Sequence, residues 1–109
     1  MEIIEIGSEP QFTDIIRSNK FVIIDFYAQW CGPCKTIAPK FEELSKKYPT
    51  VQFTKVDVDD VSEVADICQV KSLPTFMAFE NGELFDTYIG KDPFELEELI
   101  KDLMIDTCD

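Results

Sequence analysis

The sequence predicts an α/β fold with a central mixed sheet of about five strands, flanked by four helices. Residues 21–28 are almost all apolar, which is typical of a strand covered on both faces of a parallel sheet. Runs with helical spacing of apolar residues alternate with further strand-like runs. Asn81-Gly82 is a strong signal for a tight hairpin near the end. The chain of 109 residues fits one compact domain, so we expect residues 1–109 to form a single domain.

The first elements alternate strand and helix. Residues 2–6 alternate imperfectly between Glu and Ile and predict a short edge strand. Ser8 and Gln11 have the spacing of a capping box, which predicts a helix that closes at Asn19-Lys20. The buried strand 21–28 follows. Together these segments begin a βαβ arrangement.

The middle of the chain continues this alternation. A helix is expected over 34–48, with a kink at Pro39 because proline removes an intrahelical donor. The next strand is expected over 51–58. Asp60 and Glu63 again have capping-box spacing and predict a third helix. These units favour a parallel core for the sheet.

In the last third of the chain, two strands follow each other without a helix between them. Strands over 74–80 and 84–89 flank Asn81-Gly82 and are expected to pair antiparallel. Asp92-Pro93 then supplies a helix cap followed by proline at the first helical position, which predicts a final helix with a buried stripe.

Two cysteines follow the central strand directly. Cys31 and Cys34, at i and i+3 on a first helical turn, would bring their β-carbons close enough for a disulfide. Pro33 occupies a position where a helix needs no backbone N–H. Unpaired N–H groups and the helix dipole lower the pKa of a thiol at the first position, so Cys31 is expected to be the nucleophile and the deeper Cys34 the resolving thiol. Trp30 would add a flat apolar surface for another protein's backbone.

The run Trp30-Cys31-Gly32-Pro33-Cys34-Lys35 resembles the active site of the thioredoxin family. The likeness covers nearly the whole chain, in the order and at about the spacing of that family, through Asp25, Pro39, Lys55-Val56-Asp57, Pro74-Thr75-Phe76, Gly82 and Gly90.

The resemblance implies a thioredoxin fold and a dithiol carrier that reduces disulfides in other proteins. Its electrons would come from a thioredoxin reductase, so NADPH and FAD would be used indirectly and no cofactor would be bound. The implied clients are proteins such as peroxiredoxins, methionine sulfoxide reductase and ribonucleotide reductase. Gly32-Pro33 favours the reductant role, because the oxidising and isomerising relatives usually have His in place of Pro33. An oxidase or isomerase domain and a non-enzymatic binding module are the alternatives.

Asp25 lies inside the apolar strand, where an ionised carboxylate loses its hydration and its pKa should rise. One interpretation is a structural hydrogen bond to a neighbouring strand. The other is a proton acceptor for Cys34, which the resemblance supports, with Lys55 on an adjacent strand tuning it. Tyr27, where many relatives have Trp, and Gln29 are expected to stay clear of the thiol chemistry.

Pro74 has two interpretations as well. Proline is tolerated at the start of a strand. By the resemblance its peptide bond is cis, and Leu73 would offer its backbone to a client peptide beside Cys31. The same shallow docking surface would include Trp30, Gly32 and Gly90.

Composition narrows the possible partners and sites. The formal charge of −12 argues against nucleic acid and anionic membrane surfaces. No secretory signal or apolar stretch of membrane length is visible, and a Cys-x-x-Cys near a βα junction indicates redox use in a reducing cytosol, so a cytoplasmic protein is expected. We also expect it to be a monomer. A zinc site would need ligands beyond the Cys31–Cys34 pair, and the chain has no His, so no metal is expected. Cys68 is expected to be a buried small hydrophobe, and Cys108 either an incidental thiol or a partner in a regulatory or intermolecular disulfide.

Overall fold

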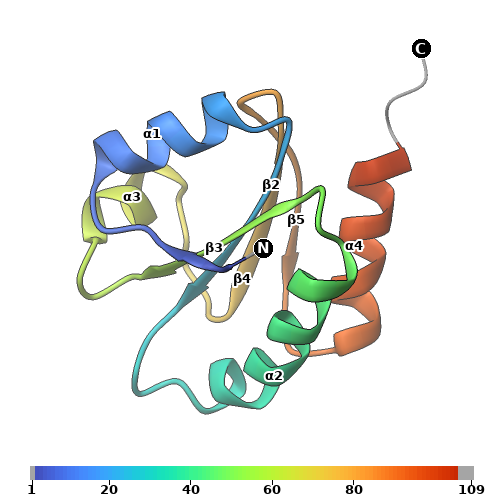
Figure 1. Ribbon diagram of the computed structural model, residues 1–109. Coiled ribbons are helices and arrows are strands. Elements are labelled where there is room, and N and C mark those ends of the chain that lie inside the picture. The colour runs from blue at the N-terminus through green and yellow to red at the C-terminus, as the bar shows by residue number, and fades with distance from the viewer. Residues whose placement is uncertain (1, 106–109) are drawn as a thin grey trace.

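The computed structural model describes residues 2–105 and has nine helices and strands in this range (Figure 1). They follow in the order β1 (Ile4–Glu5), α1 (Glu9–Ser18), β2 (Phe21–Tyr27), α2 (Gly32–Lys47), β3 (Gln52–Asp57), α3 (Ser62–Ile67), β4 (Thr75–Glu80), β5 (Glu83–Ile89) and α4 (Pro93–Ile105). The predicted fold class, five strands with four helices, is confirmed.

The five strands form one mixed sheet in the order β1-β3-β2-β4-β5. β3 pairs in parallel with β1 and with β2, while β4 runs antiparallel to both β2 and β5. The apolar run on β2 thus lies at the centre of the sheet, with β3 on one side and β4 on the other. Every β2 residue before Tyr27 is buried. The carboxyl end of this central strand leads straight into α2.

Helices cover both faces of the sheet. In Figure 1, α1 and α3 lie on one side of the strands and α2 and α4 on the other. Alternate residues of β2 follow this division, because side chains alternate between faces along a strand. Ile23 belongs to the core cluster that contains Phe41 of α2, and Ile24 belongs to the cluster that contains Ile16 of α1. The alternation places Asp25 on the face of the sheet that α2 and α4 cover.

Local signals at the ends of elements agree with the sequence at three places. Ser8 Oγ accepts a hydrogen bond from the Gln11 N–H at 3.2 Å and caps α1. The Asp92 carboxylate accepts from the Phe94 N–H at 2.9 Å and begins α4. Asn81 and Gly82 have φ of 54° and 85°, and a two-residue hairpin loop of this type requires positive φ at both positions.

Other boundaries differ from those expected. The predicted Asp60–Glu63 cap is wrong, because the residue at the start of α3 is Val61 and no side chain caps it. The Asp57 carbonyl instead accepts from the N–H groups of Asp60 and Val61, at 3.1 and 2.9 Å, and closes the turn after β3. The second helix begins at Gly32 rather than residue 34. Among residues 2–105, no helix is long and apolar enough to cross a membrane.

Candidate active site

The two cysteines of the predicted pair are joined at the first turn of α2. Cys31 is the N-cap residue, and its Sγ accepts a hydrogen bond from the Cys34 N–H at 3.2 Å. The Cα atoms of the two residues lie 5.3 Å apart, and a disulfide links them. A sulfur at this position faces unpaired backbone N–H groups and the positive end of the helix dipole, both of which favour a thiolate over a thiol.

The two cysteines differ in their neighbours and not in their depth. Cys31 is 4% exposed and Cys34 is 5% exposed, so the expected difference in burial is absent from this disulfide form. Cys31 lines a surface groove near the start of α2. Cys34 lines a second, smaller cavity that also contains Asp25. The two cysteines therefore line different hollows, Cys31 the groove and Cys34 the cavity that contains Asp25.

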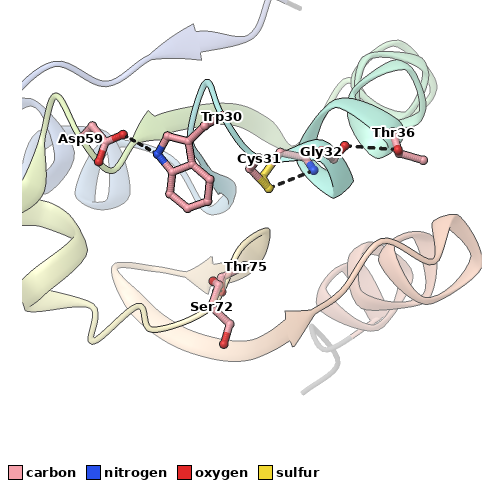
Figure 2. The surroundings of a disulfide bond; sticks show 8 residues. Trp30, Cys31, Gly32, Thr36, Asp59, Ser72 and Thr75 are labelled. Atoms are coloured by element: carbon pink, nitrogen blue, oxygen red, sulfur yellow. Dashed lines mark hydrogen bonds between the residues drawn. A yellow bond between two sulfur atoms is a disulfide. The ribbon is translucent and has the colours of Figure 1, made fainter.

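The groove beside Cys31 has a volume of about 400 Å³. Its largest exposed side chain is Trp30, which is 70% exposed and donates its indole N–H to Asp59 Oδ2 at 2.9 Å (Figure 2). The groove is lined by Trp30, Cys31, Gly32, Pro33, Val58, Val70, Lys71, Ser72 and Leu73. Its mostly apolar walls suit an extended segment of another protein.

Sequence reasoning missed several residues of this groove. Val58 follows the carboxyl end of β3, and the ends of parallel strands meet at one edge of a sheet, so strand order could have indicated it. Val70 and Lys71 come just before Leu73, and their closeness in sequence was the available signal. Asp59, which holds Trp30, carries no such signal because 29 positions separate the two residues.

The Leu73–Pro74 peptide bond is cis, as the resemblance implies. Leu73 lines the groove, whereas Pro74 is buried and neither it nor Gly90 is among the lining residues. The Gly90 N–H donates to the Pro74 carbonyl at 3.2 Å, which ties the end of β5 to this turn. A Cβ on Gly90 would lie 2.5 Å from the Tyr88 hydroxyl oxygen, and φ there is 146°. Gly90 therefore has a steric reason to be glycine.

Asp25 lies behind the disulfide, in a cavity of about 180 Å³. It is 2% exposed, and its Oδ1 has no hydrogen-bond partner among the described residues. Burial raises the pKa of this carboxyl to about 7, although the nearby Lys55 ammonium lowers it and the Glu5 carboxylate raises it further. Lys55 pairs with Asp25 in the register of β2 and β3, as expected.

Tyr27 and Gln29 also line the Asp25 cavity, together with Cys34 and Lys55, contrary to the sequence-based expectation. The Lys55 ammonium lies 4.4 Å from the centroid of the Tyr27 ring. The Tyr27 hydroxyl donates to Glu5 Oε2 at 2.8 Å. Tyr27 is therefore part of the immediate surroundings of Asp25 and Lys55.

The family model described as Thioredoxin matches residues 3–103. The chain belongs to the thioredoxin family. Thioredoxin 1 of Plasmodium falciparum is 48% identical over 88% of this chain and 92% of its own length. The mitochondrial thioredoxin-3 of Saccharomyces cerevisiae is 42% identical over 93% of this chain and 80% of its own length. A solved Plasmodium falciparum thioredoxin superposes with a TM-score of 0.90 at 46% identity, covering 92% of this chain and 98% of that one.

Membership of the thioredoxin family makes this protein a thiol–disulfide oxidoreductase that reduces disulfides in other proteins through Cys31 and Cys34. Thioredoxins act between a reductase and disulfide-containing client proteins, without a bound cofactor. Within residues 2–105, no cluster of three or more His, Cys, Asp or Glu side chains is suited to a metal ion.

Among the described residues, the remaining cysteine is Cys68. Cys68 is free and only half-buried at the end of α3, rather than fully buried as expected. It packs against the apolar cluster beneath α1 and α3, and burial raises its pKa to about 11. Cys108, the expected incidental or regulatory thiol, lies outside the described residues.

Proposed function

We propose that Cys31 is the attacking thiol and Cys34 the resolving thiol of the disulfide reduction. The Cys31 thiolate attacks one sulfur of a client disulfide, forming a mixed disulfide and releasing the other client sulfur as a thiolate. Cys34 then attacks Cys31, so that the Cys31–Cys34 bond forms and the second client thiolate leaves. Two electrons pass to the client, and protons complete its two thiols. The observation that carries this assignment is the lining of the client-sized groove by Cys31 and not by Cys34.

In the same proposal, Asp25 takes the proton from Cys34 as that thiol attacks. A pKa of about 7 supports this role, because both forms of the carboxyl are populated at neutral pH. In the reverse direction, protonated Asp25 returns the proton to Cys34 when the disulfide is reduced. Lys55, in register with Asp25, supports the step by tuning the carboxyl. Gly32 and Pro33 keep the two cysteines on one helical turn.

The proposed partners follow from the family. A flavin-containing, NADPH-dependent thioredoxin reductase would restore the dithiol, and clients such as peroxiredoxins, methionine sulfoxide reductase and ribonucleotide reductase would be reduced. Their disulfide-bearing segments would lie in the groove, against Trp30 and the Leu73 backbone, next to Pro74 and Gly90. A reductant suits a reducing compartment, so we propose that the protein acts as a monomer in the cytoplasm, although one relative is named as mitochondrial. Cell fractionation and light scattering test these two points.

Insulin reduction with NADPH and a thioredoxin reductase tests the assigned roles. Cys31→Ser should abolish turnover, whereas Cys34→Ser should lose turnover and accumulate a mixed disulfide through Cys31. Asp25→Asn should slow release of the mixed disulfide and change its dependence on pH near 7. Cys68→Ser is the matched control, since that thiol is not part of the pair, and it should keep full activity. Mixed disulfides formed through Cys34 in Cys31→Ser, with turnover retained, would contradict the assignment.

A further inference from the structure

A hydrogen-bonded pair at the edge of the sheet lies beside the Asp25 cavity and has no part in the thiol exchange itself. Tyr27, the last residue of β2, donates its hydroxyl to Glu5 Oε2 at 2.8 Å. Glu5 is exposed on the two-residue edge strand β1. An exposed glutamate without a partner samples many rotamers in water. The tyrosine hydroxyl instead holds this carboxylate near the sheet.

The strand register brings the pair close to Asp25. Glu5 pairs with Lys55 of β3, and Lys55 pairs with Asp25 of β2. The three residues therefore form one row across the sheet face that α2 covers. Neighbouring strands lie about 4.8 Å apart, so the backbone positions of Glu5 and Asp25 are about 10 Å apart. Between them lies Lys55, with its ammonium over the Tyr27 ring.

Charged and titratable groups reach the Asp25 region from β1, β2, β3 and α2. They are Glu5 on β1, Tyr27 on β2, Lys55 and Asp57 on β3, and Cys34 and Lys35 on α2. On β4 the residue opposite Asp25 is Phe76, which carries no charge. Asp57 is engaged elsewhere, since its carboxylate accepts from the Asp59 N–H at 2.9 Å and from Gln29 at 3.4 Å.

We propose that Glu5, held in place by the Tyr27 hydroxyl, is a positioning residue for proton transfer at Asp25, because its negative charge offsets that of Lys55 and keeps the buried carboxyl able to hold a proton. The inference rests on the proposed role of Asp25. Its direction agrees with the pKa of Asp25, which burial raises most, Lys55 lowers and Glu5 raises. Burial of the Tyr27 ring and its bond to Glu5 both raise the pKa of that phenol, so the hydroxyl keeps its proton at neutral pH.

A direct titration of Asp25 tests this inference. The carboxyl carbon of Asp25 can be followed by NMR in the disulfide form, in which neither cysteine of the pair titrates. In Glu5→Gln the midpoint of Asp25 should fall by about one pH unit, the size expected for a unit charge about 10 Å away at an effective dielectric constant of about 20. Tyr27→Phe keeps the ring beneath Lys55 but frees Glu5, so its midpoint should fall in the same direction. Glu2→Gln, which removes an exposed charge just before β1, should leave the midpoint unchanged.

Three results would overturn the inference. The first is an Asp25 midpoint in Glu5→Gln that equals that of the unmodified protein or lies above it. The second is an equal fall in Glu2→Gln, which would make the effect one of net charge alone. The third is a fall in the Asp25 midpoint on Glu5→Gln that is the same in the Tyr27→Phe background as in the unmodified protein. The effect of Glu5 would then not depend on the Tyr27 hydroxyl. The proposed function has a separate test, since it fails if Asp25→Asn leaves the pH profile of mixed-disulfide release unchanged.

Discussion

The buried Asp25 should make the folded protein less stable as pH rises, and Asp25→Asn should remove this effect. The pKa of this carboxyl rises from its ordinary value of 3.8 to about 7 on folding. The folded state therefore binds more protons than the unfolded state between these values, and the free energy of unfolding falls as pH increases through this window. At about 1.4 kcal/mol for each unit of pKa, the full effect is about 4 kcal/mol.

Urea unfolding of the disulfide form between pH 4 and pH 8 measures this effect. The free energy of unfolding of Asp25→Asn minus that of the unmodified protein should rise by about 4 kcal/mol over this range. The change across pH is the informative quantity, because a buried amide can add a constant cost of its own. Asp14→Asn removes an exposed carboxyl on α1 and serves as the control for net charge. A difference for Asp25→Asn that is the same at pH 4 and pH 8 would refute the reasoning.

Three further predictions concern other parts of the molecule. Gly90→Ala should lower the free energy of unfolding by about 1–3 kcal/mol in thermal melts, because its Cβ would meet Tyr88 at a positive φ, whereas Gly32→Ala, with open space around its Cβ, should have little effect. Alkylation of Cys68 by iodoacetamide at pH 7.5, followed by mass spectrometry, should be slower than that of a cysteine in a short peptide, since burial raises its pKa to about 11; equal rates would contradict this. Glu97 accepts hydrogen bonds from Lys47 and Tyr48, which lower its pKa from 4.5 to about 2, so its stabilising effect is present above pH 4.5 and is lost toward pH 2. Glu97→Gln should remove that part of the acid sensitivity in unfolding experiments, and an unchanged acid profile would show that the bonds do not act this way.

The fold was predictable because its signals are local. The buried run on β2, the Asn81-Gly82 turn and the caps at Ser8 and Asp92 each lie within a few residues of the structure that they determine. The start of α3 was not predictable in this way. The turn before α3 is closed by the backbone carbonyl of Asp57. Because every residue has such a carbonyl, the residue types in this segment do not reveal the bond.

In the active site, too, the features set by neighbouring residues were predictable from the sequence, and those set by distant strands were not. The Cys31–Cys34 pair is visible in the sequence because both thiols lie on one helical turn. The surroundings of Asp25 are not visible, because they depend on strand order. Glu5 and Tyr27 are 22 positions apart and meet only because β1 and β2 flank β3. The contact between Tyr27 and Glu5 therefore depends on the order of the strands, which the sequence does not state.

The arrangement of the disulfide between two separate hollows has a consequence for how the protein can evolve. The groove that Cys31 lines and the cavity that Asp25 lines have no residue in common, so a client bound in the groove would not occupy the cavity. Water in the cavity could then still exchange protons with the Asp25 carboxyl while a client occupies the groove. In the proposed mechanism, mutations that change the groove would leave Asp25 and the residues around it unchanged, so new clients could be acquired without altering proton transfer.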